Sequence, residues 1–404
     1  MKKWLCLLLV LVVAGCSSVH AADLMSGIKP GQVSGTEVSQ EFLTAQMDFA
    51  VELLQESVEE DKNLLISPLS VQVALSMTAN GAAGDTLSQM NAVLGLDETW
   101  RNEYLKYYVD HLPSADGYKM QLANSIWYRD TEGLTVYPEF LQTNADFYNA
   151  QAYKAPFDDG TVKAINQWVK KHTNDMIDKI VDEIDADTIM YLINALTFDG
   201  DWYRKFDSTD TYNSTFTTVT GNEVQVKMMH GMEWGYVQDD MATGFIKPYK
   251  DEQYSFVALL PNEDVSIYDY ISSLTGEGLQ QMLASAEDTD VIIAVPKFSY
   301  EYELSMNEVL KTMGMPLAFD RSQADFSKMA VGNGNIYIGD VLHKTFIAVD
   351  ELGTEAAAVT KVEMKTESAM WSEKEVYLNR PFVYMIVDNV NNLPVFMGVV
   401  MNFN

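Results

Sequence analysis

The sequence from position 351 to position 360 reads Glu351-Leu352-Gly353-Thr354-Glu355-Ala356-Ala357-Ala358-Val359-Thr360, and it follows a predicted strand over 343–350. A run of alanine ordinarily favours a helix. Here, however, the side chains alternate as they do in a strand, and the face that begins at Thr354 is small or apolar throughout. This face consists of Thr354, Ala356, Ala358, Thr360, Val362 and Met364. A loop with the residue pattern of a strand indicates that the loop can become a strand.

Apolar periodicity divides the rest of the chain into a helix-rich first half and a strand-rich second half. Helical spacing predicts helices that begin near Ser39, at Pro68 with Ser67 as N-cap, and over 84–94, 100–111, 137–147 and 162–175. Alternating or continuous apolar segments predict strands over 63–66, 121–128, 188–198, 223–229, 244–249, 254–260, 291–300, 375–387 and 393–402. This order predicts an α+β protein with large mixed sheets and a single domain over 39–404.

The composition is strongly acidic, with 27 Lys and Arg against 58 Asp and Glu and a formal net charge of −31. Nucleic acid is therefore excluded as a partner, because its phosphates must be neutralised by clustered basic residues. Electrostatic docking on anionic lipid is disfavoured for the same reason. The charge instead indicates a soluble, self-repelling extracellular surface, which fits a monomer.

Motifs of enzymes and of metal sites are missing from the sequence. The two cysteines, Cys6 and Cys16, lie at the extreme N-terminus, and the histidines are scattered at positions 20, 111, 172, 230 and 343. The chain has no G-x-S-x-G, no Walker A glycine loop and no H-E-x-x-H. An enzyme is therefore disfavoured, and no catalytic residue, metal or cofactor is predicted.

Residues 1–15 have the organisation of a secretory signal peptide. Lys2 and Lys3 precede an apolar run over 4–13 that is too short to span a membrane. The sequence Val13-Ala14-Gly15-Cys16 resembles a bacterial lipobox, which predicts cleavage before Cys16 and lipidation of this residue.

Two interpretations of the processing site remain open. Cleavage before Cys16 gives a lipoprotein at the cell surface, attached to the membrane only through its acyl chains. Ordinary cleavage after Ala21 gives a freely extracellular protein, since Val19 and Ala21 also suit a signal peptidase. Residues 17–36 are rich in Ser, Gly and Ala, so we expect 16–38 to form a flexible, lipid-anchored tether.

Several motifs resemble those of a known family. They are NLLISPLS at 63–70, ANSIWY at 123–128, NALTFDGDW at 194–202, ELGTEAAA at 351–358, LNRPF at 378–382 and Phe396-Met397-Gly398. In this order and spacing they resemble the serpins over residues 39–404. The resemblance implies the serpin fold, with three β-sheets, eight or nine helices and an exposed reactive-centre loop. It also implies suicide inhibition of serine proteases.

In serpins, a protease that cleaves the loop is trapped when the loop inserts into the main sheet as a new strand. The resemblance assigns a hinge to the start of this loop, consisting of Glu351, Gly353, Thr354, Glu355, Ala356, Ala357 and Ala358. Glycine at position 353 lets the backbone turn over without a Cβ clash. Small side chains at 354, 356 and 358 limit the barrier, whereas a buried unpaired charge would stall insertion. The hinge is therefore that of an inhibitor.

A second group of residues matches the part of the serpin sheet that opens. Ser67, Ser70, Asn194 and His343 match a polar cluster beneath this sheet, and Trp202 matches a tryptophan at its top, where insertion begins. His343 can also be interpreted as an ordinary hydrogen-bonded core histidine, and the two interpretations nearly coincide.

The spacing rules of the family give two positions for the cleaved bond. Counting sixteen positions from Glu351 leads to the bond Glu367-Ser368, whereas counting eleven back from Pro381 leads to Met370. The first count has more weight, because insertion depends on the length of the hinge side. Glu367 suits a glutamate-preferring protease. The other candidates are Met364, Thr366 and Met370 for elastase-like enzymes and Lys365 for trypsin-like enzymes.

The predicted function is therefore inhibition of serine-type endopeptidases by suicide-substrate trapping. The alternative is a non-inhibitory serpin that acts as a cell-surface binding or chaperone-like lipoprotein. The small hinge residues argue against this alternative, and formation of an SDS-stable complex with a protease would decide between the two.

Overall fold

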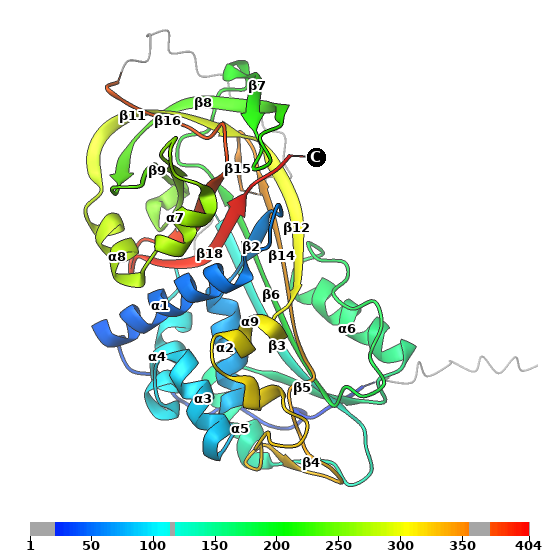
Figure 1. Ribbon diagram of the computed structural model, residues 1–404. Helices are drawn as coiled ribbons and strands as arrows, with labels where there is room; N and C mark the ends of the chain where they lie inside the picture. Colours follow the sequence, from blue (N-terminus) through cyan, green and yellow to red (C-terminus); the bar gives the residue numbers. More distant parts are fainter. Residues whose placement is uncertain (1–20, 114–117, 355–371, 404) are drawn as a thin grey trace, which may run out of the picture.

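A computed structural model describes residues 21–113, 118–354 and 372–403. Within these residues there are nine α-helices (Figure 1): α1 (Gln40–Ser57), α2 (Pro68–Ala79), α3 (Gly84–Leu94), α4 (Glu98–Asp110), α5 (Pro138–Tyr148), α6 (Asp159–His172), α7 (Ile267–Ser273), α8 (Gly276–Ala284) and α9 (Asn307–Thr312). Three of them, α7 to α9, lie in the half of the chain that was expected to be strand-rich. None of the described helices is long and apolar enough to cross a bilayer.

Sheet A contains seven strands in the order β1-β5-β3-β6-β15-β14-β12. Their bounds are β1 (Ala22–Asp23), β5 (Gln151–Ala155), β3 (Tyr118–Arg129), β6 (Met190–Asp201), β15 (Gly353–Thr354), β14 (Asp340–Val349) and β12 (Phe298–Ser305). The long strands β3, β6, β14 and β12 run side by side along the height of the molecule (Figure 1). Helix α6 covers one face of this sheet, where Ile165, Trp168 and Val169 join the cluster that contains Trp127 and Ile193.

The other long strands form one hydrogen-bonded network that bends at β8 into two sheets. Sheet C, at the top of Figure 1, consists of β7 (Thr211–Thr217), β8 (Glu223–Gln238), β11 (Glu287–Pro296) and β16 (Lys374–Tyr377). Residues 235–238 of β8 pair with β9 and so continue into sheet B. Sheet B contains β9 (Ala242–Pro248), β10 (Tyr254–Pro261), β17 (Phe382–Asp388), β18 (Leu393–Val400) and β2 (Leu64–Ile66). Together with sheet A, these are the three sheets of the predicted α+β fold, and β4 (Thr135–Val136) and β13 (Ala330–Val331) add a short ribbon.

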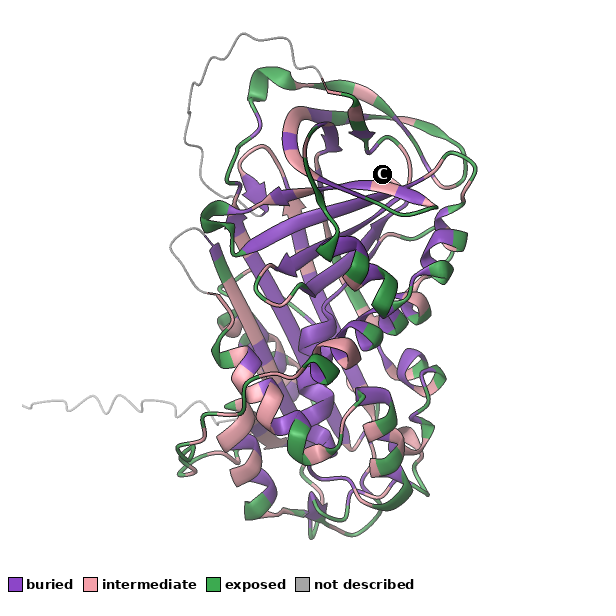
Figure 2. Ribbon diagram, turned by 90° about the vertical axis from the view of Figure 1, so that its left-hand side faces the viewer, coloured by how far each residue is buried: buried purple, intermediate pink, exposed green. Residues whose placement is uncertain are grey.

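The core lies between sheets A and B, with helix α2 inside it. The Ser67 hydroxyl caps α2 by accepting a hydrogen bond from the Ser70 backbone N–H at 3.2 Å, and Pro68 opens the first turn as predicted. Every residue of α2 is buried, because the helix contacts β6 on one side and β18 on the other. Strands β10, β17 and β18 are also buried at every position, and the central strands of Figure 2 are largely purple.

Two segments that were predicted as single strands are each divided between two sheets. Residues 291–300 belong to β11 of sheet C and β12 of sheet A, and β11 ends at Pro296. Residues 375–387 belong to β16 of sheet C and β17 of sheet B, with Pro381 between them. Proline has no backbone N–H, so it interrupts a ladder of hydrogen bonds at both points. The helix predicted over 162–175 ends at His172, and Asn174 and Asp175 adopt left-handed backbone conformations.

Residues 21–38, which were expected to belong to a flexible tether, instead lie against the domain. Strand β1 pairs antiparallel with the edge strand β5. The Gly31 backbone N–H donates to the Asp146 carboxylate at 2.6 Å, and the Thr36 backbone N–H donates to the Glu103 carbonyl at 3.2 Å. The prediction rested on the Ser, Gly and Ala composition, and composition does not indicate contacts that the backbone makes. The folded domain therefore begins no later than β1.

Candidate functional site: the hinge at the top of sheet A

Strands β6 and β14 separate at the top of sheet A, and the hinge lies between them. The two strands pair in parallel up to Leu196 and Thr345. Above this level, Thr354 of β15 pairs antiparallel with Gly200 of β6 and with Val349 of β14 (Figure 1). Strand β15 is thus the beginning of a new strand between two strands that are direct neighbours lower down.

Thr354 points into the core, on the face where the alternating pattern places it. Its side chain is buried, with 1% of the residue exposed, and its Oγ1 forms a hydrogen bond with the Tyr249 hydroxyl at 2.5 Å. Burial raises the pKa of Tyr249, so this hydroxyl stays neutral. The ring of Tyr249 stacks on Trp202 with a centroid distance of 4.6 Å. The contact is therefore made between uncharged groups in an apolar layer.

The remaining predicted hinge residues, Glu355, Ala356, Ala357 and Ala358, lie outside the described residues. The same holds for the candidates for the cleaved bond, namely Glu367, Ser368, Met364, Lys365, Thr366 and Met370, and for Cys16.

Gly353 lies too close to β6 for any side chain. A Cβ added to it would lie 2.0 Å from the Gly200 carbonyl oxygen and 2.9 Å from the Asp201 Cα. In the sequence, Gly353 was interpreted as the residue that lets the hinge turn over. The structure shows a second reason for glycine here, which is the close approach of the two backbones.

Glu351 is held by Lys297, a residue that the sequence did not single out. The Lys297 Nζ donates to the Glu351 carboxylate at 2.5 Å. Partial burial is the largest single effect on the pKa of Glu351 and raises it, but the hydrogen bond and the charge of Lys297 outweigh it together with further hydrogen bonds, and the pKa is lowered. Lys297 lies between β11 and β12, where sheets C and A diverge. The ion pair therefore fixes the start of the hinge to this junction.

The backbone of residues 202–206 holds the hinge from the other side. The Trp202 backbone N–H donates to the Leu352 carbonyl at 2.9 Å, and the Phe206 backbone N–H donates to the Glu351 carbonyl at 3.0 Å. The Trp202 indole N–H also donates to the Asp350 carbonyl at 2.8 Å. Trp202, predicted from the sequence as a residue at the top of the sheet, is thus in direct contact with the hinge.

The polar cluster predicted from the sequence lies lower in sheet A, where it joins β6, β14 and α2. His343 and Asn194 are neighbours across the β14–β6 pair. The Ser67 backbone N–H donates to His343 Nε2 at 3.0 Å, so His343 Nδ1 carries the proton that is donated to Asn194 Oδ1. The Asn194 amide donates to Ser70 Oγ at 2.6 Å. Burial lowers the pKa of His343 to about 3, so the imidazole is neutral.

Asn124 extends this cluster, and Thr345 joins β14 to β2. The Asn194 amide also donates to Asn124 Oδ1 of β3 at 2.6 Å, and the Thr345 hydroxyl donates to the Leu65 carbonyl at 2.8 Å. The sequence contained a signal for Asn124, because the alternation of 121–128 places it on the same face as the apolar Leu122 and Ile126. Separation of β6 from β14 would break the His343–Asn194 contact, so this cluster joins the two strands.

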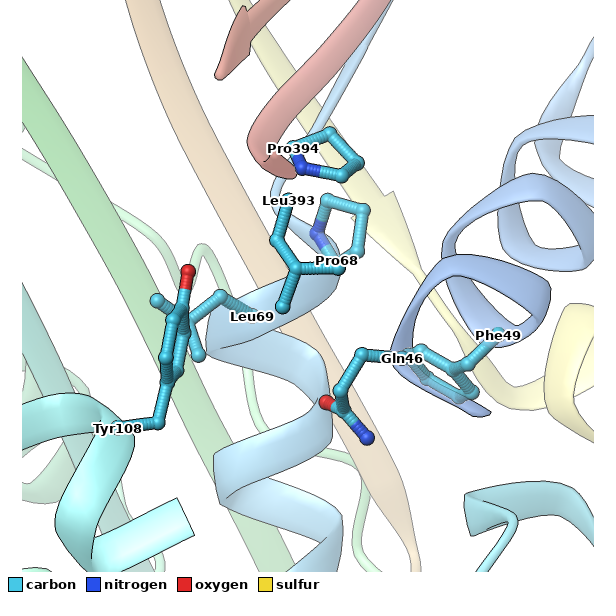
Figure 3. A pocket seen from close by; sticks show the side chains of 7 residues that line it. All are labelled: Gln46, Phe49, Pro68, Leu69, Tyr108, Leu393 and Pro394. Atoms are coloured by element: carbon cyan, nitrogen blue, oxygen red, sulfur yellow. The ribbon is translucent and has the colours of Figure 1, made fainter. Parts of the chain in front are cut away.

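The cavity beside the polar cluster, at the start of α2, is too small for a ligand. Figure 3 shows this cavity, which is lined by Gln46, Phe49, Pro68, Leu69, Tyr108, Leu393 and Pro394. Its volume of about 10 Å³ admits at most one water molecule. Among the residues that the structure describes, no three His, Cys, Asp or Glu side chains are grouped so as to hold a metal ion.

The geometry defines a class of protein in which the main sheet parts at its centre to admit the start of a loop. Residues 44–403 match the family model described as serpin, a serine protease inhibitor. The chain belongs to the serpin family, many of whose members are serine protease inhibitors rather than enzymes.

Relatives and solved structures agree with this assignment. The chain is 32% identical to a serpin-like protein of Thermococcus kodakarensis, covering 96% of this chain and 92% of the relative. It is 30% identical to Serpin B3 of Homo sapiens, covering 88% of this chain and 97% of that protein. The structure of the thermophilic serpin Tengpin in its native state matches with a TM-score of 0.92 and 45% identity, over 95% of this chain and 100% of that chain. The TM-score to Tengpin in its latent state is 0.81, over 92% and 100% of the two chains.

Proposed function

We propose that this protein inhibits serine endopeptidases as a suicide substrate whose cleaved loop inserts into sheet A. The observation that carries the proposal is β15, which already lies between β6 and β14 at the level of Gly200. Below this level β6 and β14 pair directly, so further insertion requires them to separate. The small residues of the hinge fit such a strand, because none of the side chains that would follow Thr354 on the core face carries a charge.

The register of β15 defines where an inserted loop would lie. Continued antiparallel pairing from the Thr354–Gly200 and Thr354–Val349 pairs would place Thr360 between Asn194 and His343. The same register would place Met364 beside Met190, ten residues down β6 from Gly200. Ten residues of strand correspond to about 34 Å. An acyl-bound protease would therefore be carried from one end of sheet A to the other.

The test is incubation with an elastase, a trypsin and a glutamate-specific endopeptidase, followed by denaturing gel electrophoresis. We expect an SDS-stable complex with at least one of them and release of a C-terminal fragment. Mass spectrometry of this fragment identifies the bond, since cleavage at Glu367-Ser368 leaves Ser368 at its N-terminus and cleavage after Met370 leaves Trp371. The matched control is the same protease with its nucleophilic serine replaced by alanine, which should form no such complex. Cleavage by active proteases without any complex would contradict the proposal and support a non-inhibitory serpin.

We also propose that Cys16 carries the lipid that attaches the protein to the cell surface, with residues 1–15 removed as a signal peptide. Residues 17–21 would then connect the lipid to β1 and could span at most about 17 Å. Ala22 of β1 pairs with Lys154, which pairs with Tyr128, and Tyr128 pairs with Met190 at the end of β6 opposite the hinge. Such an anchor would hold this end of sheet A near the membrane and present the hinge end outward.

A further inference from the structure

A fully buried ion pair lies beneath the loop that holds the hinge. Lys247 of β9 donates to the Glu233 carboxylate of β8 at 2.6 Å, and the two side chains are only 3% and 2% exposed. The other ion pairs among the described residues are more exposed. Burial lowers the pKa of Lys247 and raises that of Glu233, and each partner opposes the effect on the other.

Lys247 contacts the 202–206 segment as well as Glu233. Its Nζ donates a second hydrogen bond to the Arg204 carbonyl at 2.7 Å. The same ammonium lies 4.2 Å from the ring centroid of Phe206 and 5.1 Å from that of Trp202. Three residues of this segment are therefore held by one buried cation, whose orientation is set by Glu233.

The held segment is the one whose backbone N–H groups donate to the hinge. The N–H groups of Trp202 and Phe206 bind the carbonyls of Leu352 and Glu351, immediately before β15. A continuous series of contacts thus runs from Glu233 through Lys247 and the Arg204 carbonyl to the hinge backbone. Movement of the 202–206 segment would remove the donors that keep Gly353 and Thr354 in the sheet.

We propose that the Lys247–Glu233 pair is a positioning device that keeps the start of the hinge inserted between β6 and β14. Insertion after cleavage then starts from a strand that is already formed, and this consequence rests on the proposed inhibitory function. Stability of the fold does not require the charges, because apolar residues of similar volume often replace a buried ion pair without loss. The bond from Lys247 to the Arg204 carbonyl is the contact that an apolar residue cannot make.

Three variants separate positioning from stability. Lys247→Met removes the cation and leaves Glu233 buried without its partner, so its unfolding midpoint should fall. The double variant Glu233→Leu/Lys247→Met removes both charges, so its midpoint should return towards that of the wild type. Ile271→Ala, in the buried face of α7, is the control for a loss of stability away from the hinge.

The first readout is amide hydrogen exchange of the peptide that covers residues 350–354, measured on intact protein without any protease. Exchange should be at least tenfold faster than in the wild type in Lys247→Met and in the double variant, and unchanged in Ile271→Ala. Wild-type exchange at 350–354 in a folded double variant would overturn the positioning role. So would an equal acceleration in Ile271→Ala, because the effect would then follow stability alone.

The second readout is the number of inhibitor molecules consumed for each protease molecule trapped. This number should rise at least threefold in the double variant, while the rate at which the protease first cleaves the loop stays that of the wild type. An unchanged number would overturn the link between the pair and insertion. If the wild type traps none of the proteases, the proposed inhibitory function fails, and hydrogen exchange still decides whether the pair positions the hinge.

Discussion

Replacement of Thr354 by arginine should convert the proposed inhibitor into a substrate. Thr354 is the residue of β15 whose side chain points into the core, and it is 1% exposed. Its polar neighbour, the Tyr249 hydroxyl, is neutral and cannot serve as a counter-ion for a guanidinium. A strand that begins at this position must therefore bury the arginine as an unpaired charge.

The cost of this buried charge can be converted into a rate. Leaving one charge of a buried pair without its partner costs about 3–5 kcal/mol, and Thr354→Arg creates a comparable unpaired charge. Each 1.36 kcal/mol corresponds to a factor of about ten in rate, so insertion should slow at least about a hundredfold. The substitution does not change the rate at which the acyl-enzyme is hydrolysed. If insertion is slower, most of the acyl-enzyme is therefore hydrolysed before the protease is trapped.

The assay combines gel electrophoresis of the covalent complex with titration of residual protease activity. Thr354→Arg should be cleaved at the wild-type rate and yield almost no SDS-stable complex. Thr354→Val is the matched control, because it replaces the hydroxyl by a methyl group of similar size and adds no charge, and it should still trap the protease. If Thr354→Arg traps the protease as efficiently as the wild type, the insertion mechanism is wrong for this protein.

The remaining predictions concern His343, Gly35 and Cys16. Burial holds the pKa of His343 at about 3, below its ordinary value of 6.5, so the stability it contributes is complete above pH 6.5 and is lost as the pH falls towards 3. When the pH is lowered from 6.5 to 5, the wild type should therefore lose about 2 kcal/mol more unfolding free energy than His343→Gln, measured by urea titration. Equal losses in both proteins would contradict the assignment of a neutral, buried imidazole to His343. Gly35 has φ of +70°, and a Cβ on it would lie 2.6 Å from the Glu103 carbonyl, so Gly35→Ala should release residues 21–38 to limited proteolysis; unchanged protection would argue against the docking described here. Cys16→Ser should abolish membrane attachment, while a purified protein beginning at Ser17 inhibits normally; recovery of an unlipidated N-terminus at Ala22 would instead show ordinary signal cleavage.

The sequence was sufficient to predict those helices and strands whose ends are determined by their own residues. Helix α2 begins where Ser67 and Pro68 predict, because capping is decided within one turn. The segment 291–300 was not resolved into β11 and β12, since a continuous apolar run has the same appearance whether it serves one sheet or two. Which sheet a strand joins is decided by partners far away in the chain.

The same distinction applies to the site. Ser67, Ser70, Asn194 and His343 could be named because they lie in motifs that resemble the serpin family. Lys247 and Glu233 could not, because a charged residue in a strand is ordinarily exposed, and this pair is buried only in the folded protein, where Trp202 and Phe206 lie against Lys247. The docking of residues 21–38 was missed for a related reason, as it depends on backbone hydrogen bonds that any composition can make.

We infer that the native protein stores free energy that cleavage of its loop releases. The most direct test compares the thermal unfolding midpoint of the intact protein with that of protein cleaved between residues 364 and 371. An inserted loop would add hydrogen bonds to both β6 and β14 along most of sheet A, so the midpoint of the cleaved protein should lie well above that of the intact protein. An equal or lower midpoint after cleavage would contradict the account, because nicking an ordinary surface loop has that result.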